Sequence, residues 1–248
     1  MFADNELSHD AFLCGRLHLW QPLRGYRAAT DPVLLAACVD ARAGQRVLDL
    51  GCGAGAASLC LAARVPGLMQ AGLELQPAYA DLARRNAAGN GVALEVVEGD
   101  VTAMPAMLRR EFDHVIANPP YYPAGGTPSP DAGRAMALQV ATPVTDWVAA
   151  GLRRLAPGGY LTLIISVDLL PAVLGLAPHA SVLPLAPRTG RAAPRVIVKV
   201  RKLGRAPFRL LAPFVIHAGA AHDGDRESYT PEAEAVLRGG GSLSALFR

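Results

Sequence analysis

Short apolar runs alternate with longer amphipathic stretches through the middle of the chain. The apolar runs are rich in branched side chains and predict strands at residues 46–50, 71–75, 94–98, 114–118 and 160–166. The stretches at 57–65, 77–90 and 143–157 repeat apolar positions at helical spacing and predict helices. Strands that alternate with helices are typical of a parallel sheet covered by helices on both faces.

The two ends of the chain follow different patterns. Residues 30–39 open with a capping residue and a proline, as helices often do. Residues 181–186, 194–203 and 208–217 predict three further strands without a full helix between the last two, so we expect antiparallel pairing there. No repeat or linker divides the chain. We therefore expect a single domain, residues 1–248, with an N-terminal extension (1–45), a ligand-binding core (46–166) and a C-terminal basic β region (167–248).

Composition narrows the class of protein. Hydrophobic residues make up 51% and charged residues 18% of the chain, enough to bury a sizeable core. No apolar run is long enough to cross a membrane, and the acidic, polar start predicts no signal peptide. The 4 cysteines form no C-x-x-C pair, which indicates reduced thiols of a cytoplasmic protein without a zinc or other metal site.

The net charge of +3 conceals an uneven distribution of charge. No acidic residue lies between Asp168 and Asp223. The positive residues in this interval are Arg188, Arg191, Arg195, Lys199, Arg201, Lys202, Arg205 and Arg209. Such a block suits a polyanion such as RNA, although a basic face can also serve only to keep a protein in solution.

A glycine-rich turn follows the first predicted strand in the stretch VLDLGCGAGAASL, residues 47–59. Gly51, Gly53 and Gly55 allow the backbone to bend tightly and to approach a ligand closely. The loop lacks the Lys-Ser/Thr pair of a P-loop. Many turns of this kind carry glycines for packing alone, so the loop by itself leaves its ligand open.

Three acidic residues stand at the ends of successive predicted strands. A buried carboxylate at Asp49 costs free energy unless something binds it. Glu74 comes 19 residues after Gly55, where an acid can accept from both hydroxyls of a ribose. Asp100 is placed to accept from the exocyclic amine of an adenine. Each acid alone could be a helix cap or a loop residue, but three at successive strand ends favour a nucleoside-type ligand.

The acid-x-Gly-x-Gly-x-Gly pattern is similar to the S-adenosylmethionine loop of Rossmann-like class I methyltransferases, over residues 46–166. The resemblance implies an α/β fold with a mostly parallel seven-stranded sheet, antiparallel C-terminal strands and helices on both faces. It also implies S-adenosylmethionine as the cofactor. The cofactor-binding residues expected on this basis are Asp49, Gly51, Cys52, Gly53, Gly55, Glu74, Leu75, Asp100, Val101 and Asn118.

The stretch ANPPYYPAGG, residues 117–126, closes the fourth predicted strand. In methyltransferases of this kind, Asn-Pro-Pro-Tyr at a strand tip marks enzymes that methylate a planar amine nitrogen. The lone pair of such a nitrogen is delocalised, so acceptors that grip both N–H hydrogens help to localise it. Asn118 and the Pro119 carbonyl can supply these acceptors. Pro120 would stiffen the grip and Tyr121 would stack on the acceptor. The plainer interpretation is a turn cap followed by strand-ending prolines.

Three planar amines fit this chemistry: adenine N6, guanine N2 of rRNA, and the amide of a protein glutamine. Residues 21–37, 187–203 and 228–237 resemble the tRNA adenine-N6 methyltransferases, which modify the adenine beside the anticodon of a valine tRNA. That resemblance implies tRNA as the partner. The substrate-binding residues it implies are Tyr121, Tyr122, Arg134, Arg188, Arg191 and Arg195. The acidic residue that often follows the position of Arg134 in that family is missing here. An RNA-binding relative without catalytic activity is the non-enzyme alternative.

A few further residues are weaker candidates. Arg27 and Asp31 could frame the cofactor pocket, although Asp31 before a proline is first expected to cap a helix. Trp147 is expected to pack in the core.

Overall fold

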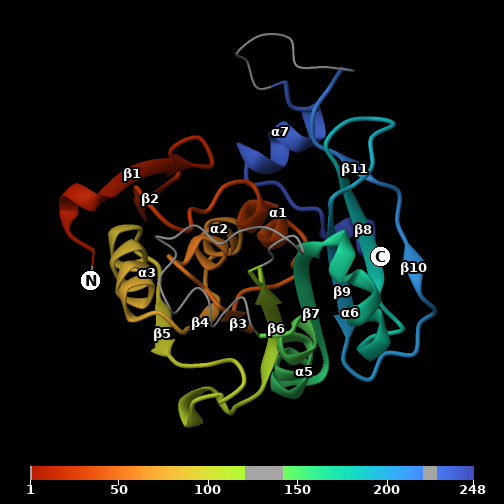
Figure 1. Cartoon of the computed structure of the whole chain (residues 1–248), viewed down its shortest axis with the longest axis horizontal. Helices are drawn as coiled ribbons and strands as arrows, with labels where there is room; N and C mark the ends of the chain where they lie inside the picture. The colour runs from red at the N-terminus through yellow and green to blue at the C-terminus, as the bar shows by residue number, and fades with distance from the viewer. Residues whose placement is uncertain (1, 121–141, 220–227) are drawn as a thin grey trace.

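A computed structural model describes residues 2–120, 142–219 and 228–248 of the chain. It places a mixed β-sheet between layers of helices, with a small hairpin at the N-terminal side (Figure 1). The helices and 3-10 turns are η1 (Asp4–Glu6), α1 (Asp31–Ala37), α2 (Ala56–Arg64), α3 (Pro77–Gly89), η2 (Ala106–Leu108), α5 (Val144–Arg154), η3 (Val167–Leu169), α6 (Leu170–Leu176), α7 (Pro231–Leu237) and η4 (Ser244–Phe247). The strands are β1 (Leu7–Phe12), β2 (Leu17–Pro22), β3 (Arg46–Leu50), β4 (Met69–Glu74), β5 (Leu94–Glu98), β6 (Phe112–Ala117), β7 (Leu155–Ser166), β8 (Ser181–Ala186), β9 (Arg195–Arg201), β10 (Arg209–Leu210) and β11 (Phe214–Val215).

The main sheet has the order β10-β8-β9-β7-β6-β3-β4-β5, with β11 also paired to β8. The pairs from β5 to β7 are all parallel, whereas β9 pairs antiparallel with both β7 and β8. The expected α/β fold, with a mostly parallel sheet and antiparallel C-terminal strands, is confirmed. The expected seven strands form its body, and β10 and β11 add two short strands at the β8 edge.

The central strands are apolar on both faces because helices cover both. In β6, Ile116 faces one core with α1, α2 and α7, while its neighbours Val115 and Ala117 face a second core with α5 and α6. In β7, Ile164 likewise faces the first core and Leu163 the second. Alternate residues of a strand point to opposite faces, so a continuous apolar run serves two cores at once. Burying each such side chain stabilises the fold by about 1.5–3 kcal/mol.

Two predicted boundaries were wrong. The helix expected at 143–157 ends at Arg154, and β7 begins at once with Leu155. Ala156 precedes Pro157, and the residue before a proline is driven out of the helical region, so the strand starts here. The strand expected at 208–217 is divided into β10 and β11, which pair in parallel with β8 rather than antiparallel with β9. Pro213 lacks an N–H group and interrupts a continuous ladder.

Residues 1–45 contain a hairpin that the sequence analysis did not identify. Strands β1 and β2 pair antiparallel, and Leu13 and Cys14 in their turn have φ angles of 50° and 53°. A connecting segment, residues 23–30, then leads from β2 to α1, and we call it the strap. Among the described residues, no helix combines the length and the apolar character that crossing a membrane requires.

Candidate active site

The parallel strands bring the predicted site residues to one edge of the sheet. Strands β6, β3, β4 and β5 are successive neighbours, and all four run in the same direction. Their carboxyl ends therefore meet at one edge, which we call the carboxyl edge. Asp49 is the next-to-last residue of β3, Glu74 ends β4, and Asn118 follows β6 directly. The predicted convergence of these three side chains follows from the observed strand order.

The glycine loop between β3 and α2 has the backbone that its sequence predicts. Gly51, Gly53 and Gly55 have φ angles of 66°, 55° and 86°, in the region that favours glycine. A Cβ atom at Gly51 would lie 2.7 Å from the ring of Trp147. The loop thus passes very close to α5 and cannot carry side chains there without displacing a neighbour.

Asp49 is a deeply buried acid of the site. Its side chain is 2% exposed, and the Ser58 hydroxyl of α2 donates to its carboxylate at 2.8 Å. The pKa of Asp49 is raised to about 7: burial raises it most, the Ser58 hydrogen bonds oppose that rise, and the charge of neighbouring Glu74 adds to it. A cation bound beside this group would favour its ionised form.

Glu74 joins the glycine loop to the second strand. Its Oε2 accepts from the Gly53 N–H at 2.9 Å and its Oε1 accepts from the Gln76 N–H at 2.9 Å. The carboxylate is 2% exposed. These two bonds fix the carboxylate at the end of β4 and tie the glycine loop to that strand.

Two adjoining hollows share Gly51. One is lined by Asp49, Gly51, Cys52 and Asn118, together with residues that the sequence analysis did not assign: Gln21, Tyr26, Ala28, Pro32, Ala54, Ala56 and Ala57. The other is lined by Gly51, Leu73, Leu75, Gly99, Asp100, Val101, Thr142 and Trp147. All the predicted cofactor-binding residues except Gly53, Gly55 and Glu74 thus line one of the two hollows.

Asp100 has a structural task as well as its place in the second hollow. Its Oδ1 accepts from the Thr102 N–H at 2.7 Å and from the Thr102 hydroxyl at 2.8 Å. These bonds cap a turn after β5, which is the plainer role considered for this acid. Its other carboxylate oxygen, Oδ2, takes no part in them.

Asn118 stands at the tip of β6, and its side-chain nitrogen donates to the Tyr26 hydroxyl at 3.0 Å. Pro119 is buried and Pro120 is half-buried. The remaining predicted substrate residues of this stretch, Tyr121, Tyr122 and Arg134, lie outside the described residues.

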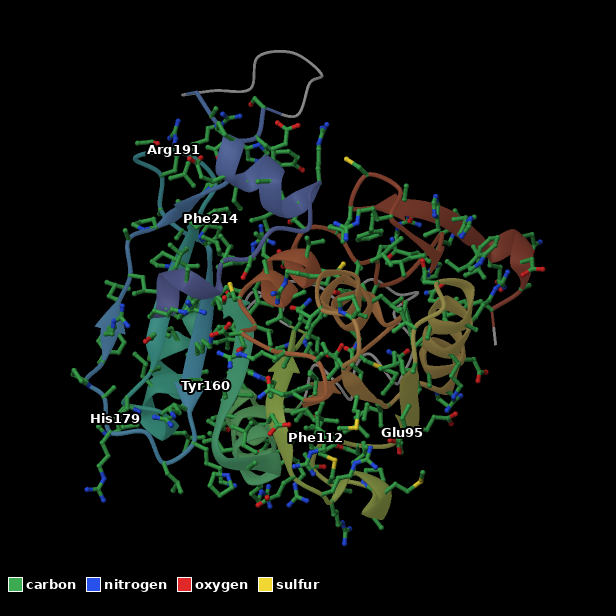
Figure 2. The ribbon with its side chains drawn as sticks, turned by 180° about the vertical axis from the view of Figure 1, so that it is seen from behind. Glu95, Phe112, Tyr160, His179, Arg191 and Phe214 are labelled. Carbon is green, nitrogen blue, oxygen red and sulfur yellow. The ribbon has the colours of Figure 1, made fainter. Side chains whose placement is uncertain are left out.

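In Figure 2, Arg191 of the basic block lies near Phe214 at one end of the sheet, and Tyr160 and His179 lie toward the other end. In the β7–β9 pair, Arg195 lies opposite Ser166 and Arg201 lies opposite Tyr160. Ser166 ends β7 on the side of the carboxyl edge. The positive residues of this segment therefore do not all gather at one end of the sheet.

Several of the basic side chains are also occupied within the fold. Arg188 is 8% exposed and donates to the Ala218 carbonyl. Arg195 forms an ion pair with Asp31, which supplies the counter-charge that its own segment lacks. Lys199 is buried and donates to the Cys38 carbonyl at 3.2 Å. Among Arg188, Arg191 and Arg195, only Arg191 is exposed.

The ion pair also corrects the role expected for Asp31. The N-cap of α1 is Thr30, and Asp31 is the first helical residue, where its charge meets Arg195. Arg27 does not line the first hollow; it pairs with Asp10 of β1 at 2.7 Å.

Three residues of the site were not identified from the sequence: Tyr26, Gln21 and Ser58. Ser58 was detectable in principle, because it follows Asp49 at the start of the next helix. Tyr26 contacts Asn118 across 92 residues of chain, and no local pattern signals such a contact. Trp147 packs as expected, 3% exposed, but it also forms a wall of the second hollow.

Comparisons with known proteins agree with this arrangement. Residues 29–172, more than half of the chain, match the model of the methyltransferase small domain. The tRNA1(Val) (adenine(37)-N6)-methyltransferase of Porphyromonas gingivalis is 33% identical over 169 residues, which are 64% of this chain and 66% of that protein. The release factor glutamine methyltransferase of Deinococcus radiodurans is 36% identical over 130 residues, 48% of this chain and 44% of that protein. The matched regions thus span less than two thirds of these relatives' lengths.

A solved structure also resembles the fold over most of its length. The crystal structure of a predicted O-methyltransferase from Agrobacterium tumefaciens superposes with a TM-score of 0.68 at 27% identity. The match covers 86% of this chain and 97% of that one.

Proposed function

Because the chain belongs to the methyltransferase small domain family and is a class I S-adenosylmethionine-dependent methyltransferase, we propose that it methylates the N6 amine of an adenine in tRNA, beside the anticodon. The observation that carries the proposal is the position of Asn118. It stands at the tip of β6, beside the same hollow as Asp49 and the glycine loop.

The described residues fit the cofactor. S-adenosylmethionine supplies a sulfonium-activated methyl group when it is bound. The buried carboxylate of Asp49 suits the cationic methionine end, because a nearby positive charge offsets the cost of ionising a buried acid. We assign the ribose hydroxyls to Glu74, whose carboxylate is fixed at the end of β4 by two backbone N–H groups. Leu75 and Val101 offer apolar walls for the adenine, with Asp100 at its edge.

The acceptor amine would be held by two oxygens from adjacent residues. The Asn118 side-chain oxygen and the Pro119 carbonyl can each accept one N–H hydrogen of a planar amine. This grip favours a tetrahedral nitrogen with a localised lone pair. Positioning such a nitrogen in line with the methyl group is most of the catalytic task, so no strong base is required. We assign stacking of the acceptor to Tyr121, with Tyr122 and Arg134 as further substrate contacts.

A tRNA acceptor is favoured by the relative from Porphyromonas gingivalis and by the exposed Arg191 at the carboxyl end of the sheet. Anticodon-loop bases are unpaired or easily splayed, so moving one into a pocket costs less than flipping it from a duplex. Such a substrate also agrees with the cytoplasmic location expected from the cysteines.

The glutamine amide remains a second candidate, because the relative from Deinococcus radiodurans matches the same core. Guanine N2 of rRNA offers the same pair of N–H hydrogens. A hydroxyl acceptor is less suitable, since a single O–H hydrogen would leave either Asn118 or Pro119 without a donor.

One experiment separates these acceptors. The purified protein is incubated with radiolabelled S-adenosylmethionine and with total RNA or total protein, and the labelled RNA is digested to nucleosides. We expect the label in N6-methyladenosine from the tRNA fraction. Label in N2-methylguanosine, or only in protein, would identify one of the other amines. Absence of transfer to any fraction would favour the inactive RNA-binding alternative.

A further inference from the structure

The strap places the side chain of Tyr26 against Asn118, the residue proposed to hydrogen-bond the substrate amine. Tyr26 lies in the middle of the strap, and its hydroxyl accepts from the side-chain nitrogen of Asn118 at 3.0 Å. The same ring stands beside the glycine loop, 3.8 Å from the point where a Cβ atom at Gly53 would lie. Although 48% of its surface is exposed, its hydroxyl end faces the first hollow.

The backbone of Tyr26 is fixed by a second phenol. The Tyr79 hydroxyl of α3 accepts from the Tyr26 N–H at 2.9 Å and donates to the Tyr26 carbonyl at 3.1 Å. Both backbone groups of one strap residue are thus satisfied by a single hydroxyl. Tyr79 is 5% exposed, so the strap is anchored to a buried side chain.

The hairpin holds the strap from the other side. Gln21 of β2 is 2% exposed, and its Oε1 accepts from the Ala28 N–H at 2.7 Å. Arg27 donates to Asp10 at 2.7 Å and to the Pro22 carbonyl at 2.9 Å. The strap residues that follow Tyr26 are therefore held by the hairpin, and the Tyr26 hydroxyl is held by its own bond to Asn118.

In the observed arrangement the Asn118 amide turns its nitrogen toward the Tyr26 hydroxyl. A carboxamide has one oxygen and one NH₂ group, and a half-turn exchanges them. Only the oxygen can accept a hydrogen bond from an amine substrate. An NH₂ group at that point would place two N–H donors against each other, and no hydrogen bond could form. With its nitrogen engaged by Tyr26, Asn118 leaves its oxygen Oδ1 for the substrate.

We propose that Tyr26 is a positioning residue for methyl transfer, whose hydroxyl holds the Asn118 amide in the one orientation that can grip a planar amine. This inference rests on the proposed grip of Asn118 and Pro119, but it requires an amine acceptor and not a particular RNA. The strap and the N-terminal hairpin thereby become part of the catalytic apparatus rather than an addition to it.

The ionisation state of Tyr26 is consistent with this role. The pKa of Tyr26 is raised to about 12, mainly because its hydroxyl is shielded from solvent, with smaller contributions in the same direction from Asp49, Tyr79 and Glu74. The phenol therefore keeps its proton throughout the working range of the enzyme, and the bond to Asn118 does not depend on pH there.

Tyr26→Phe tests the inference, because it removes only the hydroxyl. We expect kcat for methyl transfer to fall about tenfold or more, with the Kd for S-adenosylmethionine within about threefold of wild type and an unchanged Tm. Tyr160→Phe is the matched control. It removes a tyrosine hydroxyl from β7, at the end of the sheet away from the carboxyl edge, and should leave kcat unchanged. A Tyr26→Phe enzyme with kcat within about twofold of wild type would overturn the inference.

A second comparison distinguishes positioning from simple packing. In Asn118→Asp both side-chain oxygens accept, so no orientation remains for Tyr26 to hold. We expect Tyr26→Phe to slow the Asn118 enzyme strongly but to slow the Asn118→Asp enzyme by less than about twofold. Equal slowing in both backgrounds would assign Tyr26 a merely structural role.

The Tyr26 inference and the tRNA proposal can be refuted separately. The comparison uses whichever labelled acceptor the wild-type enzyme methylates, be it RNA or protein. Label in a protein amide would refute the tRNA proposal while the Tyr26 comparison proceeds unchanged. Label in adenine with a fully active Tyr26→Phe enzyme would refute the inference and leave the tRNA proposal standing.

Discussion

Asp49 and Ser58 form the most buried polar pair of the site, and their energetics depend on pH. The ordinary pKa of the carboxyl is 3.8, and burial raises it to about 7 in the folded protein. Between these values the folded protein binds a proton that the unfolded chain has lost. The contribution of Asp49 to the free energy of unfolding therefore falls as pH rises through this window, and it stays low above pH 7.

Ser58→Ala should be more costly at high pH than at low pH. The Ser58 hydroxyl donates to the ionised carboxylate, so its removal raises the pKa of Asp49 further. We expect the free energy of unfolding to fall by about 1–3 kcal/mol at about pH 8.5, and by clearly less at about pH 6. Urea denaturation at both pH values measures this difference.

Asp49→Asn provides the control, because an amide does not titrate. In that background Ser58→Ala should cost the same at both pH values. A pH-independent cost in the wild-type background would mean that Asp49 is not the titrating partner.

At the scale of elements, the glycine loop is confined between β3 and α5. A Cβ atom at Gly51 would meet Trp147 at 2.7 Å, whereas one at Gly53 would lie 3.8 Å from Tyr26. Both glycines have positive φ, so an alanine is strained at either position, but only Gly51 adds a clash.

Gly51→Ala should therefore destabilise the protein more than Gly53→Ala. We expect losses of about 2–4 kcal/mol and about 1–2 kcal/mol, respectively, in the free energy of unfolding. Thermal and urea unfolding of the two variants compare them directly. Trp147→Phe, which removes the clashing part of the ring, should recover part of the Gly51→Ala loss. Equal losses at the two glycines would show that backbone strain alone, and not the clash with Trp147, sets the loss of stability.

The elements show which patterns in the sequence were informative. Asp49, Glu74 and Asn118 could be placed together because each ends a strand and parallel strands share an edge. The start of β7 was missed because the helical spacing of 143–157 continues past Arg154, and only Pro157 marks the change. The hairpin was missed because its turn places Leu13 and Cys14 at positive φ before Gly15, and such a turn lacks the Asn-Gly or Asp-Gly pair that signals a tight hairpin.

At the scale of the whole molecule, the distribution of positive charge depends on strand direction. Strand β9 runs antiparallel to β7, so its two ends lie at opposite ends of the sheet. Arg191 precedes β9 and lies toward the carboxyl edge, whereas Arg205 follows β9 and lies at the other end. The sequence showed the number of charges in this segment but not which of them a folded chain would bury or separate.

Because the positive charges lie at two ends of the sheet, we expect two exposed arginines of the same segment to affect tRNA binding differently. Arg191→Glu should weaken tRNA binding and reduce the magnitude of its salt dependence by about one unit of slope, since one phosphate contact is lost. Arg205→Glu carries the same change of charge at the far end and should leave the affinity within about twofold. Filter binding over a range of salt concentrations measures both. Equal effects would mean that the RNA footprint covers both ends of the sheet or depends on net charge alone.

The proposed mechanism depends most on the hydrogen bond between Asn118 and a planar amine, and Asn118→Ala tests this bond directly. Asn118 borders the hollow but its side chain is assigned to the acceptor, so we expect the calorimetric Kd for S-adenosylmethionine to stay within about threefold. Single-turnover transfer of the labelled methyl group should fall by about 10²–10³-fold, because one of the two acceptors that hold the amine is lost. Transfer at the wild-type rate, with normal cofactor affinity, would contradict the account.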